Sequence, residues 1–202
     1  MRKSVRRIAV LASGGGTTLQ AVIDAISQKT LEVFEIAIVI SDNPYAYALT
    51  RAQMNGIKTH VLTADVTAEE GDKELKDVLE SANVDLVLLL GYLKLIGPIT
   101  LSHFPVVNTH PSLLPKYGGK GMHGMNVHMA VVKNEESESG VTLHWANGDY
   151  DKGQVIWQTK VPVYPSDNPR DVSDRVQMVE KTQLVYLLKA FTERKIDFPE
   201  LN

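Results

Sequence analysis

Short apolar runs alternate with amphipathic segments through the first half of the chain. Each run has the length of a strand, and residues 84–90 in particular are typical of a strand buried on both faces. The segments between the runs repeat apolar residues at helical spacing, and this order is that of parallel βαβ units. The predicted strands cover residues 8–12, 34–40, 59–62, 84–90 and 104–108, and the predicted helices contain Leu19, Val22, Ile23 and Ile26, residues 47–55 and residues 70–82.

The second half of the chain has a different pattern. Residues 141–145 and 155–161 have one wetter face, which predicts a pair of antiparallel strands. Apolar residues then recur from Val172 to Phe191 along a long closing helix. No repeat, low-complexity tract or linker interrupts the pattern. We therefore predict one α/β domain over residues 1–202, with a mostly parallel central sheet that is flanked by helices and extended by an antiparallel hairpin.

Composition permits an enzyme and argues against several other classes. The 202 residues are 44% apolar and 22% charged, which suffices for the core of one domain. A net charge of −3 gives no electrostatic reason to bind nucleic acid or an anionic membrane. The absence of cysteine excludes disulfides and thiolate nucleophiles and fits a cytoplasmic location. The apolar run at residues 8–12 is too short for a signal peptide or a membrane span.

Asn108 and His110 stand at the end of a predicted strand, where ligands of open α/β sheets bind. Alternation along a strand places both side chains on one side of the backbone and Thr109 on the other. Pro111 and Pro115 stiffen the loop that follows. Because an amide and an imidazole on one side can polarise a carbonyl and move a proton, this segment is the leading candidate for chemistry.

A glycine-rich turn, residues 13–18, joins the first predicted strand to the first helix. Free N–H groups at the start of a helix bind phosphate. A triphosphate-binding loop would end in Gly-Lys-Ser/Thr, but this chain has Gly16-Thr17-Thr18. A dinucleotide fingerprint would need a glycine where Leu19 stands, and Asp42 is its only support. The turn favours a phosphate-monoester site, with a dinucleotide site and a plain tight turn as alternatives.

Two further loops are candidates for ligand contacts. In residues 91–98, backbone groups flanked by apolar side chains can enclose a flat heterocycle, although Leu93, Leu95 and Ile96 can equally be core residues. Residues 147–153 form a predicted hairpin loop whose carboxylates are by default solvated. A catalytic histidine usually needs a carboxylate to orient it, so this loop can also supply a partner for His110.

The remaining histidines carry weaker signals. His60 and His144 lie in predicted strands and His103 closes a short helix, so we interpret each as structural. His123 and His128 are five positions apart, which does not stack two imidazoles on one helical face. Without cysteine and without a His–Glu pair at ligand spacing, the sequence predicts no metal site.

Four segments together resemble the phosphoribosylglycinamide formyltransferases: residues 13–20, 91–95, 108–117 and 151–156. The likeness runs from about Arg7 to Phe191. The Asn-x-His-Pro-Ser-Leu-Leu-Pro core is shared with other 10-formyltetrahydrofolate enzymes, so it implies the chemistry and not the acceptor. The Thr17-Thr18-Leu19-Gln20 run, Lys116-Tyr117 and the segment from Gln177 to Glu180 resemble the features of that family which favour glycinamide ribonucleotide as the acceptor.

The resemblance implies a Rossmann-like formyltransferase fold and formyl transfer from 10-formyltetrahydrofolate to the amine of N1-(5-phospho-D-ribosyl)glycinamide in de novo purine biosynthesis. It implies direct attack without a metal, with residues 1–105 as a phosphate-binding half and residues 106–202 as a catalytic and folate-binding half. We expect small-molecule substrates, no nucleic acid or membrane partner, and a monomer or homodimer. The implied catalytic residues are Asn108, His110 and Asp151; the implied substrate contacts are Gly14, Gly15, Gly16, Thr17, Thr18, Gln177 and Glu180; the implied folate contacts are Tyr92, Leu93, Lys94, Leu95, Ile96, Asn108, Asn147, Gly148, Asp149 and Tyr150.

Three places depart from the family pattern. Many relatives have an arginine where Lys94 stands, and lysine loses the bidentate fork. Ala68 and Glu69 occupy the place of another arginine, so that folate contact is not carried over. Residues 118–123 replace a commoner Pro-Gly-x-His form and leave the conformation of this loop open. Two alternatives stand beside the formyltransferase: transfer to another amine, and a non-catalytic folate- or nucleotide-binding module.

Overall fold

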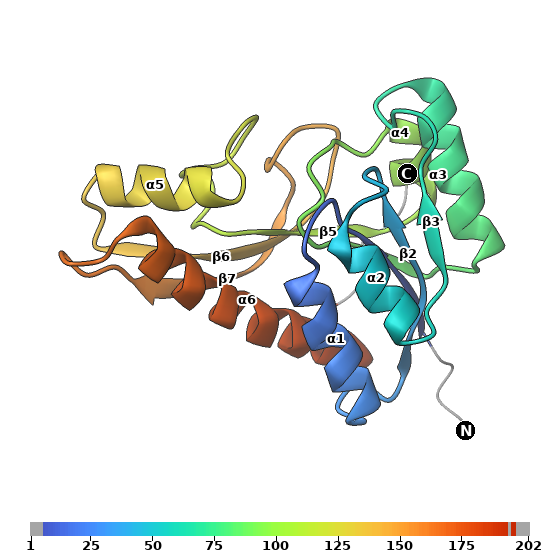
Figure 1. Ribbon diagram of the computed structural model, residues 1–202, viewed down its shortest axis with the longest axis horizontal. Coiled ribbons are helices and arrows are strands. Elements are labelled where there is room, and N and C mark those ends of the chain that lie inside the picture. The colour runs from blue at the N-terminus through green and yellow to red at the C-terminus, as the bar shows by residue number, and fades with distance from the viewer. Residues whose placement is uncertain (1–5, 194, 197–202) are drawn as a thin grey trace.

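A computed structural model describes residues 6–193, 195 and 196, so both ends of the predicted 1–202 domain lie outside the described residues (Figure 1). One seven-stranded sheet has the order β3-β2-β1-β4-β5-β6-β7. Strands β1 to β5 are parallel, and β6 and β7 are antiparallel. The elements are β1 Arg6–Leu11, α1 Thr17–Ser27, β2 Phe34–Ser41, α2 Tyr47–Met54, β3 Thr59–Val61, α3 Glu69–Ser81, β4 Leu86–Leu89, α4 Pro98–His103, β5 Val106–His110, α5 Met125–Lys133, β6 Glu138–Trp145, β7 Val155–Pro162 and α6 Pro169–Thr192.

The parallel strands are buried because helices cover both faces of the sheet. On one face, α1, α2 and the carboxyl-terminal half of α6 pack against residues such as Ile8 and Val10. On the other face, α3 packs against residues such as Ala9 and Leu11. Successive residues of β1 therefore point into different layers of core, which explains why this run is apolar at every position from Ile8 onward.

The predicted strand and helix order is confirmed, with differences at the boundaries. β6 begins at Glu138 rather than at residue 141, and β4 is shorter than the apolar run that predicted it. Helix α5 was not predicted. Its buried positions are Val127, His128 and Val131, so a histidine occupies part of its apolar stripe, and a glycine-rich loop precedes it. A polar residue in the stripe and breakers at its start weaken the helical pattern.

Asp72 of α3 fixes the start of α4 from another part of the chain. Its buried carboxylate accepts hydrogen bonds from the N–H groups of Ile99 at 2.7 Å and Thr100 at 3.0 Å. The residue that precedes α4, Gly97, makes room for this contact, because a Cβ atom there would lie 2.2 Å from Asp72 Oδ2. Asp72 thereby acts as an N-terminal cap supplied by a neighbouring helix, and it anchors the end of the turn over residues 91–97.

We expect Asp72→Ala to lower the free energy of unfolding by about 2 to 3 kcal/mol, since it leaves two N–H groups without an acceptor in the core. Urea unfolding measures the change. Asp77→Ala on the exposed side of α3 is the matched control and should change stability by less than about 0.5 kcal/mol. Equal effects of the two substitutions would contradict the capping role.

Candidate active site

A cavity of about 730 Å³ lies where β1, β4 and β5 end, and the predicted site segments line it. It collects residues from the glycine-rich turn, the apolar turn after β4, the end of β5, the β6–β7 loop and α6. Every residue predicted for the site is in its wall except Gly148, which belongs to the same loop but does not line the cavity. Segments from both halves of the sequence therefore line the same cavity.

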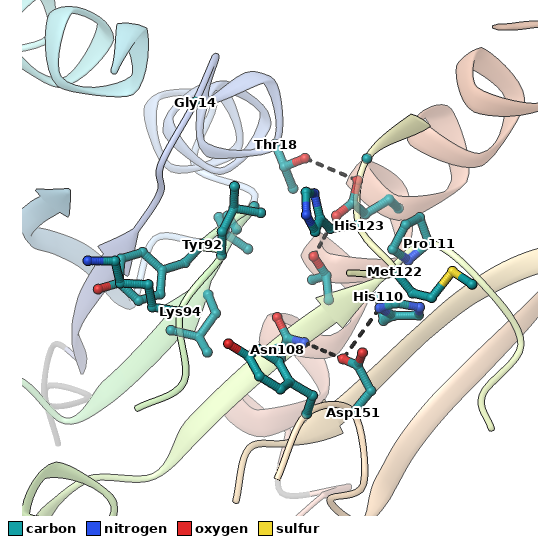
Figure 2. A pocket seen from close by; sticks show the side chains of 18 of the residues that line it. Gly14, Thr18, Tyr92, Lys94, Asn108, His110, Pro111, Met122, His123 and Asp151 are labelled. Atoms are coloured by element: carbon teal, nitrogen blue, oxygen red, sulfur yellow. Dashed lines mark hydrogen bonds and ion pairs between the residues drawn. The ribbon is translucent and has the colours of Figure 1, made fainter. Parts of the chain in front are cut away.

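Asn108, His110 and Asp151 meet inside this cavity (Figure 2). Asn108 Nδ2 donates to Asp151 Oδ1 at 3.3 Å, and His110 Nδ1 lies 3.4 Å from the same oxygen. The side chains of His110 and Asp151 are 5% and 10% exposed. Both β5 residues therefore point to one carboxylate oxygen, as strand alternation predicts, and the loop that bears Asp151 does reach His110.

The His110 ring is held from both sides. Its Nε2 lies 2.7 Å from the carbonyl oxygen of Tyr117, which can only accept, so Nε2 carries a proton. The other nitrogen, Nδ1, then faces the Asp151 carboxylate. With a second proton on Nδ1, both ring nitrogens donate, and the ring becomes a cation next to an anion. The ring can gain or lose this proton without losing its bond to Tyr117.

Asp151 is kept in its charged form. Burial disfavours that form, but the nearby donors, His110 first among them, outweigh burial and hold the pKa of the carboxyl well below its usual range. The Gly119 N–H also donates to Oδ2 at 2.9 Å. The cavity therefore contains a fixed negative charge beside His110 at neutral pH.

His144 is a site residue that the sequence interpretation missed. Its Nδ1 donates to the Trp145 carbonyl at 3.0 Å, which leaves Nε2 free to accept from Asn108 Nδ2 at 3.0 Å. Asn108 and His144 are direct partners in the β5–β6 ladder. This contact fixes the Asn108 amide with its nitrogen toward Asp151. Only the strand register reveals it, because nothing near His144 in the sequence marks a site.

The glycine-rich turn adopts the backbone of an anion site. Gly16 precedes α1 in the left-handed conformation, with φ 67°, and no side chain caps the helix. A Cβ atom at Gly16 would lie 2.8 Å from the Cα and Cβ atoms of Ala48, so a side chain would clash with α2. Glycine is needed here for both reasons. The turn lines the cavity through residues 14–18.

Glu180 of α6 joins two walls of the cavity. Its Oε1 accepts from Thr109 Oγ1 at 2.5 Å and its Oε2 accepts from Thr18 Oγ1 at 3.3 Å. Burial raises the pKa of Glu180, and the bonds from Thr109 and Thr18 only partly oppose that rise. Thr109 thus faces away from Asp151, as alternation predicts. On the same helix, Gln177 lines the cavity and donates to Ser173 at 3.1 Å.

Comparison with known proteins gives a consistent result. The family model described as formyl transferase matches residues 6–188. The chain belongs to the formyl transferase family. Phosphoribosylglycinamide formyltransferase of Haemophilus influenzae is 36% identical over 196 residues, which are 95% of this chain and 90% of that protein. Its Escherichia coli counterpart is 34% identical over 197 residues, 96% of this chain and 90% of that one. The crystal structure of glycinamide ribonucleotide transformylase 1 from Symbiobacterium toebii has a TM-score of 0.86 at 31% identity and covers 98% of this chain and 92% of its own.

The apolar turn of this formyl transferase is both core and cavity wall. Tyr92 and Ile96 are buried in the core beneath the sheet, whereas Leu93 is half-exposed. Lys94 Nζ lies 3.6 Å from Asp65 and 3.9 Å from Asp42, so two carboxylates accompany this lysine. Ile96 therefore fits both interpretations, because it also lines the cavity, whereas Leu93 lines the cavity without being a core residue.

The loop that departs from the formyl transferase pattern also lines the cavity. Lys120, Met122 and His123 are in the wall, and Gly119 and Gly121 have φ of 97° and 86°. In the described part of the chain, no group of three or more His, Asp or Glu side chains is arranged to hold a metal ion. Across residues 6–193, no helix combines the length and apolar character needed to cross a bilayer.

His128 is a buried, neutral neighbour of His110. Burial, together with a smaller contribution from the nearby His110, lowers the pKa of His128 to about 4. Its Nδ1 has no hydrogen-bond partner among the described residues. As pH falls, the unfolded chain takes up this proton near pH 6.5, before the folded chain does. The contribution of His128 to stability is therefore present above pH 6.5 and lost as pH falls toward about 4.

We expect His128→Gln to reduce the loss of stability between pH 7 and pH 4.5 by about 2 to 3 kcal/mol relative to the wild type. Urea unfolding at several pH values measures the difference. The contributions of the carboxyl groups are the same in both proteins, so they cancel in the comparison with the wild type. Met129→Gln, on the exposed side of α5, should keep the wild-type pH dependence. An unchanged slope in His128→Gln would contradict burial of a neutral imidazole.

Proposed function

We propose that this formyl transferase passes the formyl group of 10-formyltetrahydrofolate to the amine of N1-(5-phospho-D-ribosyl)glycinamide, a step of de novo purine biosynthesis. The observation that carries the proposal is the convergence of Asn108, His110 and Asp151 in a cavity that also holds an anion-binding turn and an apolar turn. The similar phosphoribosylglycinamide formyltransferases support this acceptor. The absence of cysteine fits a cytoplasmic reaction.

The proposed chemistry is attack of a primary amine on the formyl carbon. As the new C–N bond forms, the formyl oxygen gains negative charge. Asn108 Nδ2 and protonated His110 Nδ1, both of which face Asp151 Oδ1 in the structure, are the donors that would turn to it when substrate is bound, and such a donor is worth about 3 kcal/mol. Asp151 then balances the charge of the imidazolium. No side-chain nucleophile is needed, because the amine itself attacks.

Collapse of the tetrahedral intermediate breaks the bond between the formyl carbon and N10 of the folate. N10 must gain a proton as it leaves, and the attacking nitrogen must lose one. His110 can deliver the first proton from Nδ1 and recover the second, directly or through water. Its Nε2 stays bonded to Tyr117 throughout, so the ring keeps its orientation while Nδ1 changes state.

The two substrates are assigned to opposite parts of the cavity. Residues 14–18 would hold the phosphate through backbone N–H groups, and Gln177 and Glu180 would contact the ribose or the amine. Residues 92–96 and 147–150 would enclose the pterin, with Asn108 between the two sites. A volume of about 730 Å³ is in the range of cavities that enclose drug-sized ligands.

A formyl-transfer assay tests the proposal. Purified protein is given 10-formyltetrahydrofolate with glycinamide ribonucleotide, or with amino sugars and other amines, and the folate absorbance change is followed. We expect turnover with glycinamide ribonucleotide and at least a hundredfold lower kcat/KM with the others. Folate binding without turnover on any amine would favour a binding module. A higher kcat/KM with another amine would show that glycinamide ribonucleotide is not the preferred acceptor.

We expect Asp151→Asn to lower kcat about a hundredfold or more, because the neutral amide no longer balances an imidazolium at His110. The KM values for both substrates should change much less. Steady-state kinetics of Asp151→Asn beside Asp174→Asn, an exposed α6 residue, measure the effect. A wild-type kcat in Asp151→Asn would remove the carboxylate from the mechanism.

A further inference from the structure

Three successive carbonyl groups of the glycine-rich turn accept hydrogen bonds from the segment around α2, which does not line the cavity. The Ser13 carbonyl accepts from Asn43 Nδ2 at 3.3 Å, and the Gly14 carbonyl accepts from the Ala48 N–H at 3.0 Å. The Gly15 carbonyl accepts from Arg51 Nε at 2.8 Å. These donors come from α2 and the residues just before it. A separate segment of the chain therefore sets the orientation of three successive peptide groups.

This orientation turns the N–H groups of the turn toward the ligand side. In a planar trans peptide, C=O and the following N–H point in opposite directions, so a carbonyl held at the back presents the next N–H at the front. Within residues 6–193, the N–H groups of residues 14–19 have no hydrogen-bond acceptor in the protein. Unpaired donors gathered in this way attract an anion.

Arg51 of α2 bonds to this turn and is fixed in place. Besides the bond to Gly15, its Nη1 donates to Gln20 at 3.2 Å, and its guanidinium lies 5.0 Å from the centre of the Tyr47 ring. No ion pair with a carboxylate is found for Arg51 in the described chain. The turn has no lysine or arginine of its own. Arg51 does not line the cavity, so it acts from behind the backbone.

We propose that Arg51 is a positioning residue for the phosphate of the acceptor substrate. It holds the Gly15 carbonyl so that the Gly16 N–H faces the phosphate, and its unpaired charge lies behind the turn, where it lowers the cost of binding a dianion. Helix α2, which lies beside α1, thereby contributes to substrate binding although it does not reach the cavity (Figure 1). This inference rests on the proposed function, because it assumes a phosphate-bearing acceptor.

The test separates the phosphate from the rest of the substrate. Arg51→Met keeps the aliphatic stem over Tyr47 and removes the donors and the charge. Initial rates are measured with glycinamide ribonucleotide and with its dephosphorylated ribonucleoside. We expect kcat/KM for the ribonucleotide to fall about ten- to a hundredfold. The value for the ribonucleoside and the KM for the folate should stay within about twofold of the wild type. Arg170→Met, an exposed arginine at the start of α6, is the control and should match the wild type.

Loss of activity to the same extent with both substrates would overturn the inference, since damage to the fold does not distinguish them. An unchanged ribonucleotide kcat/KM in Arg51→Met would also overturn it. If Arg51→Met does not fold, Arg51→Lys is used, which keeps the charge without the planar fork, and a ribonucleotide-specific loss is again expected. Failure of the wild type to use the ribonucleotide would instead reject the proposed function.

Discussion

The change of strand direction at β5 is the constraint on which the rest of the site depends. β5 pairs in parallel with β4 and antiparallel with β6. The parallel side brings the ends of β1, β4 and β5 to one edge of the sheet. The antiparallel side sets His144 opposite Asn108. It also starts the β6–β7 connection beside Val106, so this loop has to fold back over β5 to bring Asp151 to His110.

Two carboxyl groups that line the same cavity have pKa values shifted in opposite directions. At Asp151, His110, Asn108 and a backbone N–H donate to the carboxylate, overcome burial and favour the anion. At Glu180, two hydroxyl groups are weaker donors, and burial dominates. The environment therefore shifts the pKa values of two similar side chains in opposite directions, which is how one fold separates roles among carboxyls. The anion is favoured at Asp151, beside the His110 imidazole, and disfavoured at Glu180, beside Thr18 and Thr109.

Local patterns predicted the parts of this site that depend on backbone period. Strand alternation was enough to place Asn108 and His110 together and to separate Thr109, which bonds to Glu180 instead. The βαβ order likewise predicted the parallel sheet and the position of the glycine-rich turn between β1 and α1.

Other parts depend on contacts between distant segments and were not predictable in this way. His144 enters the site through the register of β6, and α5 contains a buried histidine where an apolar residue would signal a helix. The choice of Asp151 over Asp149 as the partner of His110 follows from the path of a loop, which composition does not determine. The roles of these residues in catalysis remain predictions.

The close contact of Gly16 with Ala48 has a consequence for how this protein can change. The two positions are far apart in the sequence, yet a Cβ atom at Gly16 would lie 2.8 Å from the Cα and Cβ atoms of Ala48, so position 16 has no room for a side chain while α2 keeps its place. Helix α2 and the turn it supports thus pack as one unit. Any redesign of the enzyme toward an acceptor with a different anionic group would have to exchange both segments together.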